Sequence, residues 1–248
     1  MCTLLIAIGV SGAPGLYAIA NRDEALDRPA APPAIHERRG MKVLAPTDLE
    51  AGGTWLGLND AGIFAGITNR FRMESKPGHT SRGMLVFRAL QERSAVVASE
   101  IIAGLNPRDY NGFHLVIAGQ GEGFIVWNDT TTIRREALAP GYHAITERSF
   151  GAAPSRRRDR LRRRLAELGE WNAERPAQLR RWMVEHDEDS LEATCVHLEE
   201  ANYGTRSSTL VEVGDDDWKF CHADGAPCTT PYRKYDAEIE VLRAAQSD

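Results

Sequence analysis

The sequence predicts an α+β fold in which antiparallel β-sheets are stacked and covered by helices. Short apolar runs of strand length occur in blocks, turn residues separate the runs within a block, and helical periodicity appears in pairs between the blocks. A doubly wound parallel sheet would instead alternate single strands with single helices. No linker, repeat or low-complexity segment divides the 248 residues, so residues 1–248 are predicted to form a single domain.

The first block of strands lies in the first third of the chain. Residues 2–8 and 16–20 are apolar and flank a turn rich in Gly and Pro, which predicts a hairpin. Residues 28–33 contain three prolines and are predicted to form a loop, because proline donates no backbone hydrogen bond. Residues 55–58 and 63–68 flank an Asn-Asp-Ala-Gly turn, which predicts a second hairpin.

The remainder of the chain alternates between helical and strand patterns. Apolar residues recur at helical spacing from residue 84, and a second helix is predicted over residues 95–103. Four short strands follow, over residues 113–118, 123–128, 131–138 and 142–146. Three helices are then predicted, over residues 154–168, 177–185 and 190–200. A hairpin of residues 208–213 and 218–222 closes the pattern.

The composition argues against several classes of partner. A net charge of −5 gives no electrostatic reason to expect nucleic acid, and no apolar stretch is long enough to span a membrane. No basic segment precedes the first apolar run, so a signal peptide is not expected. The four cysteines, at positions 2, 195, 221 and 228, form no disulfide framework, which indicates reduced thiols and a cytoplasmic location.

The sequence also lacks the familiar zinc-binding spacings. It has no two-pair cysteine pattern and no His-Glu-x-x-His segment. Cys195 and His197 fall in the helix predicted over residues 190–200, where side chains two positions apart point in different directions. Cys221 and His222 have no further ligand context. We therefore expect packing and surface roles for all four, no metal and no required cofactor.

Cys2 is the residue with the clearest chemical potential. It follows Met1 directly, and an initial methionine is removed readily when the next side chain is small. The chain would then begin with a thiol beside a free α-amine, whose pKa of about 8 allows it to accept the thiol proton. One residue would supply both nucleophile and base. The alternative is that Cys2 is a small apolar residue at the start of a buried strand.

The first predicted hairpin brings the segment Asn21-Arg22-Asp23-Glu24 beside Cys2. A carboxylate such as Asp23 can orient an α-amine, and Arg22 can lower the pKa of a thiol or bind an anionic group. The alternative is a charged turn exposed to solvent.

Several further motifs accompany Cys2 and the segment 21–24. They are Gly53-Thr54-Trp55-Leu56-Gly57, Asn59 to Gly62, Thr68-Asn69-Arg70, Ser81-Arg82-Gly83, Tyr110-Asn111-Gly112-Phe113 and Tyr203-Gly204-Thr205-Arg206. Together they resemble the NRDE family, the group that includes the transport and Golgi organisation proteins. The matches run from residue 2 to about residue 213, which is nearly the whole chain.

The resemblance implies a four-layer αββα sandwich of the N-terminal-nucleophile (Ntn) hydrolase type. This fold is similar to that of the choloylglycine hydrolase and penicillin V acylase group, whose nucleophile is an N-terminal cysteine. The implied catalytic residues are Cys2 as nucleophile, Asp23 as the carboxylate that holds the amine, Asn69 as an oxyanion donor and Arg206 as an arginine near the nucleophile. The residues expected around a substrate are Asn21, Arg22, Glu24, Arg70, Phe71 and Glu147.

The sequence departs from that group at two positions. Ala20 stands where those hydrolases usually have an arginine three residues before the aspartate. Glu147 occupies a segment in which they have an asparagine, and an ionised glutamate cannot donate to an oxyanion. We expect Cys2, Asp23, Asn69 and Arg206 to converge on one cleft, with Glu147 at the place of an oxyanion donor.

Two classes of function follow from these residues and from the resemblance. The first is a hydrolase that cleaves a linear amide or a related acyl bond through Cys2. The second is a non-catalytic carrier that holds haem or an acyl-CoA lipid in the same cleft.

The arginine-rich segment 155–165 adds one further expectation. Leu161, Leu165 and Leu168 space like one buried helical face, which predicts that the arginines lie on the solvated side. The alternative is that they attract an anionic ligand such as an acyl-CoA phosphate.

Overall fold

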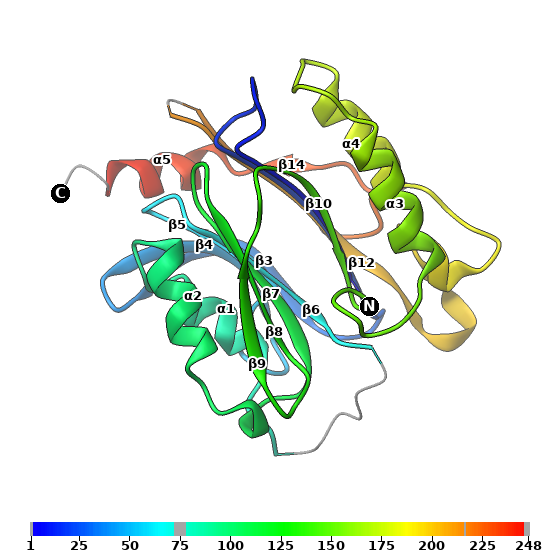
Figure 1. Cartoon of the computed structure of the whole chain (residues 1–248), viewed down its shortest axis with the longest axis horizontal. Coiled ribbons are helices and arrows are strands. Elements are labelled where there is room, and N and C mark those ends of the chain that lie inside the picture. Colours follow the sequence, from blue (N-terminus) through cyan, green and yellow to red (C-terminus); the bar gives the residue numbers. More distant parts are fainter. Residues whose placement is uncertain (1, 72–77, 216, 246–248) are drawn as a thin grey trace.

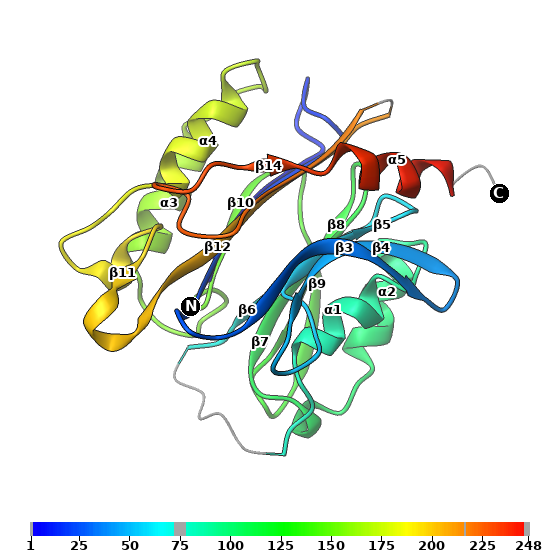
Figure 2. The same cartoon turned by 180° about the vertical axis from the view of Figure 1, so that it is seen from behind.

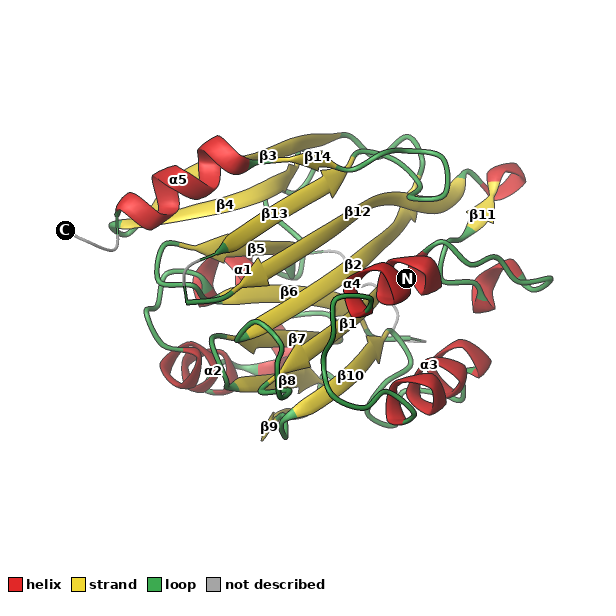
Figure 3. Ribbon diagram, turned by 90° about the horizontal axis from the view of Figure 1, so that it is seen from above, coloured by secondary structure: helices red, strands yellow, loops and turns green. Residues whose placement is uncertain are grey.

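The computed structural model describes residues 2–71, 78–215 and 217–245, whose strands form two antiparallel sheets. The first sheet has the order β10-β1-β2-β12-β13-β14, and β11 pairs with β12. Its strands are β1 (Cys2–Ile8), β2 (Leu16–Ala25), β10 (Gly141–Thr146), β11 (His197–Leu198), β12 (Tyr203–Val213), β13 (Trp218–Ala223) and β14 (Arg233–Lys234). Figure 3 shows β10, β1, β2, β12 and β13 side by side in this order.

The second sheet follows chain order, so that each strand pairs with the next. Its strands are β3 (Ala30–Arg38), β4 (Met41–Asp48), β5 (Leu56–Asn59), β6 (Phe64–Asn69), β7 (Phe113–Ala118), β8 (Gly123–Asn128) and β9 (Ile133–Ala137). The predicted turn between β5 and β6 is present, and the Asn59 side chain closes it by accepting hydrogen bonds from the backbone N–H of Ala61 and Ile63.

Helices cover the outer face of each sheet. The helices α1 (Gly83–Ala89) and α2 (Ala95–Ala103) lie on the second sheet, while α3 (Arg156–Ala166) and α4 (Arg175–Met183) lie on the first, as Figure 1 shows. The layers therefore run α, β, β, α, which confirms the predicted fold. None of the helices in the described part of the chain has the length and apolarity to cross a bilayer.

Three apolar cores fill the spaces between these layers. Successive side chains on a strand point to opposite faces, so Leu4 and Ile6 of β1 join the core between the sheets, and Leu5 joins the core beneath α3 and α4. Leu161 supplies that last core from α3, as its helical spacing predicted. A third core lies between the second sheet and α1 and α2.

The Pro-rich segment is a strand and not the predicted loop. It opens β3, which lies at the edge of the second sheet, and the pairing of β3 with β4 is shifted in register between Ala31 and Ala34. Proline is tolerated at an edge strand with such a bulge because one side of the strand needs no ladder hydrogen bonds. The prolines are compatible with a strand here because β3 is an edge strand, and the local sequence does not reveal that position.

The helix predicted over residues 190–200 is also wrong. The structure has a 3₁₀ turn (Ser190–Glu192), the short strand β11 and a second 3₁₀ turn (Glu199–Ala201). Cys195 and His197 therefore do not lie on a helix, and the Cys195 Sγ lies 3.5 Å from the His197 Nε2.

A C-terminal helix, α5 (Asp236–Ala244), was not predicted. Its buried residues Ile239 and Leu242 join the core between the sheets, and the helix contacts β4 of one sheet and β13 of the other. Figure 2 shows α5 at the side of the molecule where the two sheets meet it.

Candidate active site

Cys2 lies at the start of β1, and its partner in the sheet is Arg22 of β2. Residues directly opposite each other in an antiparallel pair point to the same face, so both side chains face the second sheet. They line a cavity of about 380 Å³ between the sheets. Asn69, at the end of β6, lines this cavity from the opposite sheet.

The segment 21–24 lies within β2 and does not follow it, because this strand continues to Ala25. Its side chains therefore alternate between the two faces of the sheet. Arg22 points toward the second sheet, where its guanidinium lies 4.4 Å from the centre of the Trp55 ring. Asn21 points toward the helices, where its amide donates to the carbonyl oxygens of Met183 and Thr194, both at 2.8 Å.

Asp23 lies on the helix side of β2 and also lines the edge of the cavity. Its Oδ1 accepts a hydrogen bond of 2.7 Å from the hydroxyl of Thr205, the residue opposite it on β12. Its Oδ2 lies 3.6 Å from the Nη1 of Arg157. Burial raises the pKa of the Asp23 carboxyl to about 6, although Arg157 and the Thr205 hydrogen bond lower it.

Arg157 is fully buried, which corrects the expectation that the arginine-rich helix keeps its arginines in solvent. Its guanidinium donates to Glu147 Oε2 at 2.5 Å and to the carbonyl oxygen of Ala193 at 2.8 Å. Arg157 is therefore the cation that two buried carboxylates, Asp23 and Glu147, share. The sequence contained a signal for this, because Arg157 precedes the buried Leu161 by four residues and lies on the same helical face.

Glu147 is held away from the Cys2 cavity. It follows β10, the neighbour of β1, and its carboxylate is bound by Arg157 and by Arg148, whose Nε lies 3.3 Å from Oε1. It is not among the residues that line the cavity. Glu147 thus forms a structural ion pair beneath the site. It does not occupy the place of an oxyanion donor, where the sequence predicted it.

The Cys2 thiol is held in an environment that favours its protonated form. Burial raises the pKa of this thiol, and the negative charge of Asp23 raises it further. The backbone N–H of Asp23 and the Arg22 guanidinium act in the opposite direction. The thiol therefore needs a base that takes up its proton if it is to act as a nucleophile.

Guanidinium and carboxylate groups line the rest of the cavity. Arg22 lies 3.9 Å from Glu24 and 3.8 Å from Asp48, and Arg28 pairs with the same Asp48 at 2.9 Å. Arg82 lines the other side, from the start of α1. Sequence reasoning had not assigned Arg28, Asp48 or Arg82 to the site, although Arg82 belongs to the quoted motif Ser81-Arg82-Gly83.

Besides Glu147, four of the predicted site residues lie outside this cavity. Arg70 donates to the carbonyl oxygen of Phe150, and Phe71 packs against the Arg148 guanidinium at 4.2 Å. Asn21 contacts the helical layer. Arg206 does not converge on Cys2: it lies at a register shift of β12, donates to the Leu26 carbonyl oxygen at 3.0 Å and lines a separate cavity of about 250 Å³.

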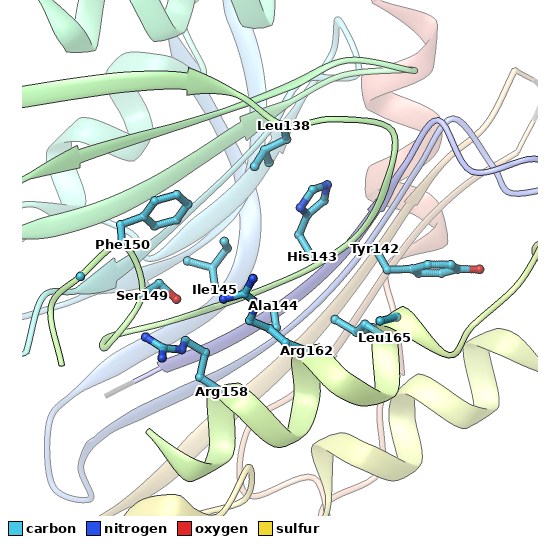
Figure 4. Close-up of a pocket in the computed structure, with 12 residues that line it drawn as sticks. Leu138, Tyr142, His143, Ala144, Ile145, Ser149, Phe150, Arg158, Arg162 and Leu165 are labelled. Carbon is cyan, nitrogen blue, oxygen red and sulfur yellow. The ribbon is translucent and has the colours of Figure 1, made fainter. Parts of the chain in front are cut away.

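A larger cavity of about 720 Å³ lies between β10 and α3 and contains none of the predicted site residues. Leu138, Ile145 and Phe150 line it with apolar surface. Figure 4 shows Arg158 and Arg162 projecting from α3 at its other side.

Solved structures with the same fold come from acylase and amidase proteins. A Caenorhabditis elegans N-acylethanolamine-hydrolyzing acid amidase (NAAA) ortholog matches with a TM-score of 0.60 and 16% identity, over 87% of this chain and 94% of that chain. Penicillin V acylase from Agrobacterium tumefaciens matches with a TM-score of 0.51 and 12% identity, over 90% and 83% of the two chains. These likenesses confirm the Ntn-hydrolase-like fold.

Sequence comparison identifies the family. The Transport and Golgi organization 2 homolog of Mus musculus is 31% identical over 138 residues, which are 53% of this chain and 50% of the relative. The Bos taurus homolog is 29% identical over the same shares, so the chain spans about half the length of these relatives. The family described as Transport and Golgi organisation 2 matches residues 1–222, and this chain belongs to it, as its motifs predicted.

Proposed function

We propose that this protein is an Ntn-type cysteine hydrolase that cleaves a linear amide or a related acyl bond through Cys2. The observation that carries the proposal is the placement of Cys2 in a polar cavity with the buried carboxylate of Asp23 at its edge. Thr205 donates a hydrogen bond to this carboxylate, and Arg157 forms an ion pair with it. Two structural neighbours are named as an acid amidase and an acylase, which supports an acyl amide as the substrate class.

The proposed reaction uses the groups around this cavity in sequence. The Cys2 Sγ attacks the acyl carbon while its proton passes to the Cys2 α-amine, which Asp23 holds. The Asn69 amide donates a hydrogen bond to the oxyanion that forms. The C–N bond then breaks, the leaving amine takes the proton, and water hydrolyses the thioester to release the acid.

The mechanism requires that the peptide bond before Cys2 is cut. Met1, whose removal the sequence predicts, lies outside the described residues. Intact mass of the active protein tests this step directly. Active protein that retains Met1 in full would rule out the α-amine as the base.

Replacement of the nucleophile tests the proposal itself. Cys2→Ser should keep the fold and lower turnover of a panel of N-acyl amides and acyl thioesters by more than about 1,000-fold, because the hydroxyl is a weaker nucleophile. Cys221→Ser, at a half-buried thiol in β13, is the matched control and should retain turnover. Unchanged turnover in Cys2→Ser would refute the assignment.

The second candidate function is a carrier of haem or acyl-CoA lipid in the same cleft. It is favoured by the protonated state of the Cys2 thiol and by Arg22, Arg28 and Arg82, whose guanidinium groups suit carboxylate or phosphate groups. For a carrier, Cys2→Ser should leave haem and acyl-CoA affinity unchanged, and Arg82→Leu should weaken it. For the hydrolase, Cys2→Ser abolishes turnover whatever its effect on binding.

A further inference from the structure

Four side chains with metal-ligating atoms meet at the end of the first sheet, away from the Cys2 cavity. They are His186, Cys195, His197 and Cys228, and their ligand atoms all lie within 4.8 Å of one another. The part of the chain that the structure describes contains this one such group of His, Cys, Asp and Glu side chains. None of the four was assigned a role in the proposed reaction.

The distances within the group match the edges of a tetrahedral site. Zinc bonds of about 2.3 Å to sulfur and about 2.0–2.1 Å to nitrogen place two sulfurs about 3.8 Å apart and a sulfur and a nitrogen about 3.5 Å apart. The Cys195 and Cys228 Sγ atoms are 3.6 Å apart. The His197 Nε2 lies 3.5 Å from the first and 3.3 Å from the second.

His186 completes the group from the segment that follows α4. Its ring centre lies 4.9 Å from that of His197, the side chain is exposed, and one of its ring nitrogens lies within 4.8 Å of each of the other three ligand atoms. Two imidazoles and two thiolates in a tetrahedron are one of the donor sets of structural zinc sites.

The backbone is built to bring these separate segments together. The Glu185 carbonyl oxygen accepts hydrogen bonds from the N–H of both Thr194 and Cys195, at 3.2 and 3.0 Å, which closes the loop that carries His186. His197 pairs with Gly204 of β12, where a Cβ would lie 2.9 Å from the Val196 carbonyl oxygen. Glycine at this position is therefore what allows the His197 segment to approach β12.

Cys228 arrives from the loop between β13 and β14. The Ala226 carbonyl oxygen accepts hydrogen bonds from the N–H of Thr229 and Thr230, at 3.1 and 2.9 Å, so the turn around Cys228 is defined. In Figure 2 this loop and the segment that carries β11 lie at the same end of the molecule.

We propose that His186, Cys195, His197 and Cys228 bind one Zn²⁺ ion as a structural site. Four protein ligands leave no open position for a substrate, which distinguishes a structural from a catalytic site. Binding replaces two thiol protons with the metal, and the protons are released to solvent.

The site would also support the carboxylate next to Cys2. Val196 lies between two of the ligands, and its N–H donates to the Thr205 hydroxyl at 2.8 Å. That hydroxyl donates to Asp23 at 2.7 Å. The proposed ion would therefore hold in place the segment that positions Thr205, and metal binding is proposed whether or not Cys2 is a nucleophile.

Metal stoichiometry in the full-length reduced protein tests the proposal. Wild-type protein stripped with a chelator and reloaded with Zn²⁺ should retain about one ion per chain after gel filtration, and Co²⁺ should give the visible spectrum of a tetrahedral thiolate complex. Cys195→Ser and Cys228→Ser should each weaken Co²⁺ binding by more than about 100-fold, since even loss of an outer hydrogen-bond partner costs 10–100-fold.

Two control variants and one conservative variant make the result specific. Cys221→Ser and Cys2→Ser should bind one Co²⁺ as the wild type does. Cys228→His supplies another ligand and should recover tetrahedral Co²⁺ binding with weaker thiolate absorption. No stoichiometric binding by folded wild-type protein, or wild-type affinity in folded Cys228→Ser, would overturn the proposal. A Cys195–Cys228 disulfide in protein kept under reducing, anaerobic conditions would overturn it as well.

Discussion

The two helical layers of this protein cover similar sheets but are held in different ways. The layer of α1 and α2 packs through apolar side chains such as Leu85 and Phe87. The layer of α3 and α4 also has an apolar core, but it buries Arg157 completely between Asp23 and Glu147. Buried charge is costly unless it is paired, and the paired charges of Asp23, Arg157 and Glu147 support the edge of the candidate site from the α3 side.

The buried ion network also extends to the start of α3. Glu192 accepts hydrogen bonds from the backbone N–H of Arg157, from the Ser155 hydroxyl and from Arg148 Nη1. Ser155 itself caps the helix by accepting from the N–H of Arg158. The helix is thereby positioned by polar contacts that set the location of Arg157.

Removal of Arg157 should have the largest effect, on the stability of the α3 and α4 layer. Arg157→Met leaves Asp23 and Glu147 buried without their shared cation, and should lower the free energy of unfolding by about 3–5 kcal/mol at pH 8. The pKa of Asp23 is about 6 with Arg157 present, and loss of Arg157 raises it. Protonation at pH 5 therefore removes part of the unpaired charge, and the loss of stability should be smaller there. Urea denaturation at the two pH values measures both losses.

Leu85→Ala in the apolar layer is the matched control for that variant. Its cavity should cost about 2–5 kcal/mol, with the same loss at pH 5 and pH 8. If Arg157→Met loses less than about 1 kcal/mol of unfolding free energy, or if its loss is independent of pH, then the buried ion pairs do not stabilise the α3 layer as described.

Asp23→Asn should have the next largest effect, on the reactivity of the Cys2 thiol. The Asp23 charge raises the pKa of this thiol, so its removal should increase the thiolate fraction and speed alkylation of Cys2 by iodoacetamide several-fold at pH 7.5. Arg22→Leu removes a charge that lowers the same pKa and should slow alkylation. Mass spectrometry of the Cys2 peptide gives both rates, and equal rates in all three proteins would show that these charges do not reach the thiol.

Thr205→Val should have the smallest effect. The Thr205 hydroxyl stabilises ionised Asp23, and its loss should move the pKa of Asp23 upward from about 6 by roughly one unit, since a hydrogen bond to a charged group contributes about 1.5–3 kcal/mol and solvent or Arg157 replaces part of it. The pH dependence of Cys2 alkylation reports this titration. Thr209→Val, at another buried threonine of β12, should leave the profile unchanged.

Much of the fold could be predicted from the sequence, because its strands are apolar and its turns carry distinctive residues. β1, β7 and β8 match the predicted ranges, and so does α2. The missed features depend on partners that the local sequence does not reveal. β3 keeps its prolines because it lies at an edge, and residues 190–200 form no helix because β11 within them pairs with β12.

The candidate site was predictable where strand pairing alone determines it. Cys2, Arg22, Glu24 and Asn69 line one cavity with Asp23 at its edge, as the hairpin and the resemblance implied. Arg206 lies elsewhere because it is the residue at the register shift of β12. Arg157 was missed because a run of arginines suggests a solvated helical face. Its burial is explained by the two buried carboxylates with which it pairs, Asp23 and Glu147.

The most direct test of the hydrolase account is the detection of an acyl group on Cys2 itself. Protein whose chain begins at Cys2 is mixed with an intact N-acyl amide that it hydrolyses. The mixture is quenched in acid within the first turnover, digested and analysed by mass spectrometry. The account predicts a thioester on the Cys2 peptide that decays at the rate of turnover and is absent in Cys2→Ser. Hydrolysis that proceeds at the same rate in Cys2→Ser, with no acyl group found on Cys2 in the wild type, would contradict it.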